Sequence, residues 1–166
     1  MSASSQNRRQ TRRLAMQVLY QIDATGETDA EAIFAGLDED HDPVAVRAEA
    51  VALALAAWTG RDALDAKVGK LAADWPTHRQ PPVDRAILRL AVHEMVTGRT
   101  PPRVAINEAV ELAKQFSNEN APAFINGVLD KLHRSLDLPP ETKTSSTEES
   151  KPADPVAWLD DATRDE

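Results

Sequence analysis

Apolar residues recur with a helical period along most of the chain. In the first long stretch, Ala15, Val18, Leu19 and Ile22 stand at positions i, i+3, i+4 and i+7 of one helix face. We find no convincing alternation of apolar and polar residues of the kind that marks a half-buried strand. The pattern predicts an all-α protein of about seven helices, over residues 9–25, 29–37, 43–58, 62–73, 83–96, 103–116 and 121–136.

Helix-ending and helix-starting residues support these boundaries. Gly26 is placed to close the first helix, and Asp29 and Asn120 are placed to cap the helices that follow them. Residues 75–82 (WPTHRQPP) contain three prolines and no apolar period. We therefore predict a helical domain over residues 1–138, divided into two halves by this linker.

The composition changes after residue 138. Residues 139–166 consist largely of Thr, Ser, Glu, Lys and Pro, with eight acidic and three basic residues and a net charge of −5. Such a segment has too few apolar side chains to offset the entropy of ordering, which predicts a disordered acidic tail. Residues 155–159 (PVAWL) are an apolar patch within it. They are either passively exposed or a short docking segment for a partner or for the protein's own surface.

The composition excludes several kinds of catalytic and metal site. The absence of cysteine excludes disulfides, thiolate zinc sites and cysteine nucleophiles. The four histidines lack metal-ligand spacing, and no phosphate-binding loop or nucleophile motif occurs. No apolar run approaches the roughly 18 residues of a membrane span. We expect a cytoplasmic protein that is not an enzyme and needs no metal or cofactor.

The start of the chain carries the opposite charge to the whole. The net charge is −8, yet the first acidic residue is Asp23, and four basic residues precede it: Arg8, Arg9, Arg12 and Arg13. A short basic block on an acidic protein is typical of a local contact with an anionic partner, and nucleic acid is the first candidate.

The first helix also places a tyrosine in line with the arginines. Arg9, Arg13, Met16 and Tyr20 are spaced to share one face, displaced from the apolar stripe that begins at Ala15. Guanidinium groups bind phosphates and a phenol ring can stack on an unpaired base, which favours single-stranded nucleic acid. Alternatively, the arginines are a solvated extension and Tyr20 is a half-buried packing residue.

Four segments resemble one known family. They are residues 8–20 (RRQTRRLAMQVLY), 83–94 (VDRAILRLAVHE), 104–116 (VAINEAVELAKQF) and 124–132 (FINGVLDKL). In order and spacing they resemble the NusB family of transcription antitermination factors, over residues 8–136. The resemblance implies two small helical bundles. It also implies a protein that binds boxA RNA of nascent transcripts, notably of ribosomal RNA operons. The family does so with the ribosomal small-subunit protein NusE and helps RNA polymerase resist termination.

The resemblance also implies roles for particular residues. The RNA-binding positions would be Arg8, Arg9, Arg12 and Arg13, with Tyr20 nearby and Phe124 close to the RNA. Asp84 matches an acidic position near the NusE interface, and Asn120 falls in a loop used by both partners. Ala123 stands where some relatives place a lysine, so that contact with RNA is missing here.

Two other hypotheses for the function remain at this point. The first is a protein-interaction module that binds NusE or another partner with little affinity for RNA. The second is the helical domain of an RNA cytosine methyltransferase, for which about 30 further residues leave no room for a cofactor-binding sheet. A further hypothesis is that the acidic tail competes with RNA for the arginines.

Overall fold

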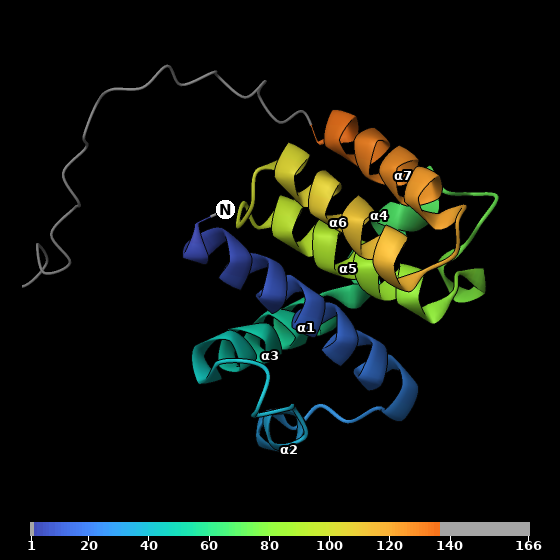
Figure 1. The fold of residues 1–166 in the computed structure, drawn as a ribbon. Helices are drawn as coiled ribbons and strands as arrows, with labels where there is room; N and C mark the ends of the chain where they lie inside the picture. Colours follow the sequence, from blue (N-terminus) through green and yellow to red (C-terminus); the bar gives the residue numbers. More distant parts are fainter. Residues whose placement is uncertain (1, 137–166) are drawn as a thin grey trace, which may run out of the picture.

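The computed structural model describes residues 2–136; the predicted tail over residues 139–166, with its PVAWL segment, lies outside the described residues. Within the described part the chain forms helices and no strand, which confirms the all-α prediction (Figure 1). The seven α-helices are α1 (Ala3–Thr25), α2 (Ala30–Ala35), α3 (Val44–Thr59), α4 (Arg61–Leu71), α5 (Pro82–Val96), α6 (Pro102–Phe116) and α7 (Ala121–Ser135), and a 3₁₀ turn, η1, spans Thr77–Arg79. Of the helices between residues 2 and 136, none combines the length and apolarity needed to cross a membrane.

The helix ends follow the local chemistry of the sequence, with two differences. Gly26 closes α1 in the left-handed conformation at φ 75°, and the Asp29 side chain accepts a hydrogen bond from the Ala32 backbone N–H at 2.8 Å. α1 begins six residues earlier than predicted, because Ser2 caps a polar first turn that apolar spacing does not reveal. Asn120 occupies the N-cap position of α7 but makes no capping hydrogen bond with its side chain.

The side chain that caps α7 is Asn118. Its Oδ1 accepts hydrogen bonds from the backbone N–H groups of Asn120 and Ala121, both at 3.0 Å. The predicted cap is therefore in the right place but supplied by a residue two positions earlier. The side chain of Asn120 stays exposed and available at the surface.

The helix contacts fall into two sets. α1, α2 and α3 pack together, and α4 packs against α5 and α7 while touching α3 only slightly (Figure 1). α3 and α4 meet at Gly60 with few contacts between them, and the division at residues 75–82 stays a prediction. The proline-rich segment connects two helices of the same group because α4 buries Leu64 and Val68.

α5 lies at the centre of the molecule. It contacts α1, α3, α4, α6 and α7, and consecutive residues from Ala86 to Val92 are all buried. A helix that is buried on all sides has no wholly polar face, so its polar residues must find partners inside the protein. Three of them, Asp84, Arg89 and Glu94, are at least nine-tenths buried and hydrogen-bonded.

Arg12 ties α1 to this central helix. Its Nε donates to both carboxylate oxygens of Glu94 at 3.0–3.1 Å, and its Nη2 donates to Thr100 Oγ1 at 3.0 Å. The Thr100 hydroxyl in turn donates to Glu94 Oε1 at 2.8 Å. Arg12 is 8% exposed and Glu94 2%. This buried cluster fixes the rotation of α1, and therefore decides which arginines face outward.

Arg89 and Arg85 tie the other end of α1 to the second group. Arg89 binds Asp65 of α4 through two hydrogen bonds of 2.7–2.9 Å and lies 3.4 Å from Asp23 of α1. Arg85 donates to the same Asp23 at 2.7 Å. Burial alone would lower the pKa of Arg89, but Asp65 and Asp23 hold it above its usual value. The network joins α1, α4 and α5.

Removing Arg12 should destabilise the fold far more than removing a neighbouring arginine. Arg12→Ala leaves Glu94 buried without its counter-charge, and we expect it to lower the free energy of unfolding by roughly 3–5 kcal/mol. Arg9→Ala breaks an exposed ion pair and should cost about 0–1 kcal/mol. Urea denaturation followed by circular dichroism measures both. Equal losses in the two variants would contradict the structural role of Arg12.

Candidate nucleic-acid interface

Arg9 and Arg13 of α1 face one surface groove together. The groove runs between α1 and α6 and has a volume of about 250 Å³. Arg9 and Arg13 are four residues apart, so they lie one turn apart on the same side of the helix. Their side chains are 47% and 39% exposed, which leaves both guanidinium groups within reach of a ligand.

Each of these two arginines already contacts a carboxylate. Arg9 Nε lies 3.1 Å from Glu108 Oε1 of α6, and Arg13 Nη2 lies 3.1 Å from Asp42 Oδ1 in the loop before α3. The two ion pairs orient the side chains and lower the positive charge of the surface. A phosphate that binds here must compete with Glu108 and Asp42, so part of its interaction energy is offset.

Amide side chains complete the groove. Its lining includes the glutamines Gln6, Gln10 and Gln115. An amide both donates and accepts hydrogen bonds, which suits base edges and sugar hydroxyls as well as phosphates. Glu111 also lines the groove, and a hydrogen bond from Lys114 lowers its pKa. Glutamines beside arginines indicate a polar polymer rather than an apolar ligand.

The other two predicted arginines lie elsewhere. Arg12 is buried in the cluster with Glu94 and Thr100, where its outward reach is small. Arg8 is exposed and lines a separate groove with Arg99, whose guanidinium pairs with Glu49. The four arginines thus divide between two grooves: Arg9 and Arg13 line the first, and Arg8 and the largely buried Arg12 line the second. Their roles in RNA binding stay predictions.

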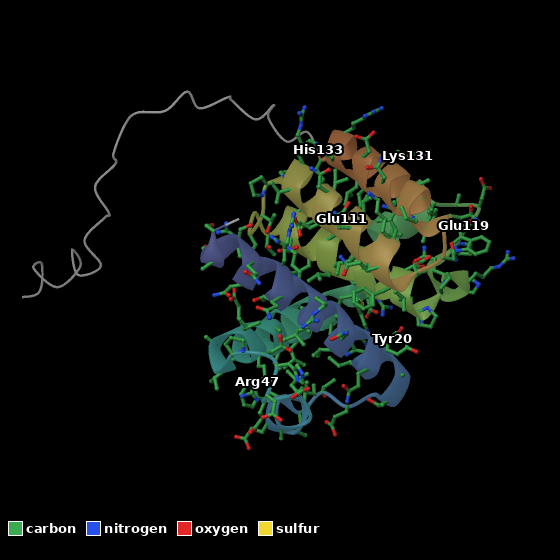
Figure 2. The ribbon with its side chains drawn as sticks, viewed as in Figure 1. Tyr20, Arg47, Glu111, Glu119, Lys131 and His133 are labelled. Atoms are coloured by element: carbon green, nitrogen blue, oxygen red, sulfur yellow. The ribbon has the colours of Figure 1, made fainter. Side chains whose placement is uncertain are left out.

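The predicted face from Arg9 to Tyr20 is interrupted. Met16 is only 2% exposed and belongs to the core, so the face predicted to be displaced from the apolar stripe meets the core at that position. Tyr20 is 45% exposed on α1, beyond the end of the groove (Figure 2). Its ring is separated from Arg13 by about two helical turns, and its role in stacking stays a prediction.

A second candidate surface surrounds the start of α7. Asp84, Asn120 and Phe124 line one pocket of about 300 Å³, together with Trp75 and Pro81. These three residues come from α5, from the loop before α7 and from α7 itself, and the fold brings them together. The contact of Asp23 with Arg85 places the C-terminal half of α1 beside the helix that supplies Asp84.

The residues of this pocket differ in what they can offer a partner. Asp84 is 3% exposed, and its carboxylate accepts a hydrogen bond from the Ser117 hydroxyl. It therefore shapes the pocket more than it presents a free charge. Phe124 is half-buried, while Trp75 is 42% exposed. An exposed tryptophan next to a phenylalanine makes this a mainly apolar surface, typical of a protein contact.

Sequence reasoning did not assign Trp75, Glu108 or Asp42 to either surface. Trp75 stands in the proline-rich segment, where no apolar period marks it as part of a site. Glu108 and Asp42 lie 99 and 29 residues from the arginines that they pair with, so no local spacing relates them. Ala123, in place of the lysine of some relatives, is exposed beside Phe124. Among residues 2–136, no cluster of three or more His, Asp or Glu side chains could hold a metal ion.

Comparison with known proteins gives one consistent result. The sequence model of the NusB family matches residues 9–134. The transcription antitermination protein NusB of Roseiflexus sp. (strain RS-1) is 38% identical over 125 residues, which cover 74% of this chain and 88% of the relative. NusB of Solibacter usitatus (strain Ellin6076) is 38% identical over 135 residues, covering 80% and 92%.

Solved structures agree with the sequence matches. NusB of T. maritima superposes with a TM-score of 0.68 and 29% identity, covering 76% of this chain and 90% of the other. A crystal structure of antitermination factors NusB and NusE in complex with double-stranded RNA contains a chain that matches with a TM-score of 0.68. It is 26% identical and covers 78% of this chain and 98% of the other. The match extends over both helical groups and both candidate surfaces, and the protein belongs to the NusB family.

Proposed function

We propose that this protein is a non-enzymatic antitermination factor of the cytoplasm. It binds boxA-type RNA of nascent ribosomal RNA transcripts together with NusE, and the complex helps RNA polymerase resist termination. The observation that carries the RNA part is the groove between α1 and α6, where Arg9 and Arg13 stand one turn apart beside three glutamines. Family membership and the NusB–NusE–RNA relative support the same function.

The proposed RNA site extends along α1. Arg9 and Arg13 supply phosphate contacts, and Tyr20 supplies an exposed ring further along the same helix. Phe124, which the family resemblance places close to the RNA, lines the separate pocket that contains Asp84 and Trp75. Because guanidinium and ring contacts need no base pairing, single-stranded RNA fits this arrangement. The related crystal structure holds double-stranded RNA, so both forms belong in the test.

The proposed NusE site is the pocket that Asp84, Asn120 and Phe124 share with Trp75. A protein partner gains much of its binding energy from burying exposed aromatic rings. Of the two aromatic residues that line the pocket, Trp75 is the more exposed. The buried hydrogen bond between Asp84 and Ser117 holds the start of α5 against the end of α6. This contact keeps the pocket in shape before a partner arrives.

The second candidate is an interaction module that binds NusE but little RNA. The pairing of Arg9 with Glu108 and of Arg13 with Asp42 favours it, since both cations are partly neutralised in the free protein. The two candidates differ in one measurable property. RNA binding through arginines weakens steeply with salt, whereas binding of NusE through an apolar pocket does not.

Fluorescence anisotropy with labelled RNA tests the RNA site. Single-stranded boxA RNA should bind more tightly than a scrambled strand, and more tightly still with NusE present. Arg9→Ala and Arg13→Ala should each lower the salt dependence of log K by roughly 0.7 for the lost phosphate contact. Arg134→Ala is the matched control, because Arg134 is exposed at the end of α7 and pairs with Asp130. Equal effects of all three variants would contradict the proposed site, and a boxA duplex that binds best would revise the single-strand assignment.

Removing the carboxylate that competes for Arg9 should strengthen RNA binding. We expect Glu108→Gln to raise the affinity for boxA RNA by up to roughly fivefold, the equivalent of an exposed ion pair of 0.2–1 kcal/mol. Glu31→Gln on the exposed surface of α2 changes the net charge equally and should have a smaller effect. If the two variants bind alike in anisotropy titrations, the pair with Glu108 does not restrain Arg9.

The partner pocket is tested through Trp75. Trp75→Ala should weaken NusE binding at least roughly tenfold, because truncation of a central aromatic contact commonly costs 2 kcal/mol or more. Calorimetry with purified NusE measures the change, and binding of RNA alone should stay the same. Val104→Ala removes an equally exposed apolar side chain from α6 and serves as the control. A loss of NusE affinity from Val104→Ala alone would place the partner on a different face.

A further inference from the structure

An apolar groove between α4 and α7 is left open at the surface. It has a volume of about 320 Å³ and is lined by Leu71 at the end of α4, by Trp75, and by Phe124 and Val128 of α7. Trp75 and Phe124 also line the pocket that contains Asp84 and Asn120, so the two hollows adjoin. Together they form one continuous, mainly apolar surface that includes the exposed ring of Trp75.

The groove is shaped for a short apolar segment with acidic neighbours. Gly127 and Ala123 form part of its floor on α7, where small side chains leave room for larger ones. Lys131 lines the end of the groove nearest to the C-terminus of α7 (Figure 2). Asp74 also lines the groove. An occupant with apolar side chains followed by carboxylates would match the apolar walls and Lys131 at the same time.

This chain carries such a segment outside the described residues. Residues 155–159 (PVAWL) are followed at once by Asp160 and Asp161. We propose that the PVAWL segment docks into the groove between α4 and α7, with Trp158 and Leu159 among the apolar walls and the two aspartates beside Lys131. The occupant is thus the chain's own tail. This agrees with one of the two hypotheses from the sequence, in which the segment docks on the protein's own surface.

The covalent connection is long enough for this contact. The described residues end at Leu136, and 18 residues separate Leu136 from Pro155. Extended, they reach roughly 60 Å. Lys131 and Phe124 precede Leu136 by five and twelve residues on α7, which corresponds to about 8 and 18 Å along the helix. Because the segment is tethered, its effective concentration at the groove is in the millimolar range, and modest affinity suffices for occupancy.

The charges of the tail and of the groove favour the tail as the occupant. The tail has a net charge of −5, and its apolar residues are flanked by Asp154 on one side and Asp160 on the other. Lys67 on α4 lies one turn before Leu71 and adds a second cation near the groove. Docking brings Asp160 and Asp161 close to Lys131, with Asp74 the opposing charge in the groove wall, and it removes Trp158 and Leu159 from water.

Docking would mask the proposed partner surface. Trp75 and Phe124 belong to both hollows, so the PVAWL segment and NusE would compete for them. This consequence rests on the proposed function, whereas the docking itself does not. If the segment occupies the groove half of the time, the apparent affinity for NusE falls roughly twofold.

Paramagnetic relaxation enhancement in the full chain tests the docking. The chain has no cysteine, so Ala162→Cys provides a single site for a nitroxide label next to the segment. With the chain labelled with ¹⁵N, the amide signals of Ala73, Ala123 and Gly127 should lose intensity selectively. The matched control carries the same label and the further changes Trp158→Ala and Leu159→Ala, which keep the tether and the charges. In this control the selective loss should disappear.

Three results would overturn the proposal. The loss at the groove could be the same with and without Trp158 and Leu159, which would show only random encounters of a tethered label. It could fall on the amides of residues 8–13, which would place the tail on the arginines. It could also persist when nitroxide-labelled ¹⁴N chain is mixed with unlabelled ¹⁵N chain, which would make a second copy the donor of the segment.

A separate titration distinguishes failure of the docking from failure of the proposed partner site. The chain with Trp158→Ala and Leu159→Ala should bind NusE roughly twofold more tightly, or better, than the unchanged chain. Selective loss at the groove together with unchanged NusE affinity would establish the docking and would contradict the placement of NusE at Trp75. The reverse combination would overturn the docking.

Discussion

The buried contact of Arg12 with Glu94 and Thr100 decides what the rest of the first helix can do. It joins α1 to the central helix α5 and to Thr100 in the loop before α6, and a rotated α1 would leave Glu94 without its counter-charge inside the protein. With Arg12 fixed inward, Arg9 and Arg13 are held in the groove toward α6 and the Asp42 loop. One arginine thus orients the arginines on either side of it, and the basic surface is a product of the core.

The two candidate surfaces differ in the interactions that would bind a ligand. The groove of α1 and α6 is polar, and its cations are restrained by carboxylates that a phosphate would have to displace. The hollows around Trp75 and Phe124 are apolar and preformed, with the hydrogen bond between Asp84 and Ser117 holding α5 and α6 together beneath them. The first surface favours a charged polymer in a salt-dependent way, and the second favours a protein segment that can cover exposed rings.

Helices were predictable from the sequence because apolar spacing is local, whereas their partners depend on contacts between distant residues. α4 was found, but its packing against α5 and α7 rests on Leu64, Val68 and the Asp65–Arg89 pair, which no spacing relates to one another. Arg12 illustrates a signal that was present: it lies three residues before Ala15, in line with the core stripe, as Arg9 and Arg13 do not. Trp75 gave no such signal, because a single aromatic residue among prolines fits an exposed linker as well as a binding surface.

Asp23 accepts contacts from both Arg85 and Arg89, and it belongs to the helix that carries the arginine groove. The end of α1 is therefore held rigidly against the helix whose first turn shapes the second surface. Such a connection allows the two surfaces to be thermodynamically linked. If RNA and NusE occupy them as proposed, any factor by which one ligand raises the affinity of the other must apply equally in the reverse direction. The order in which the two ligands arrive would then leave the stability of the complete assembly unchanged.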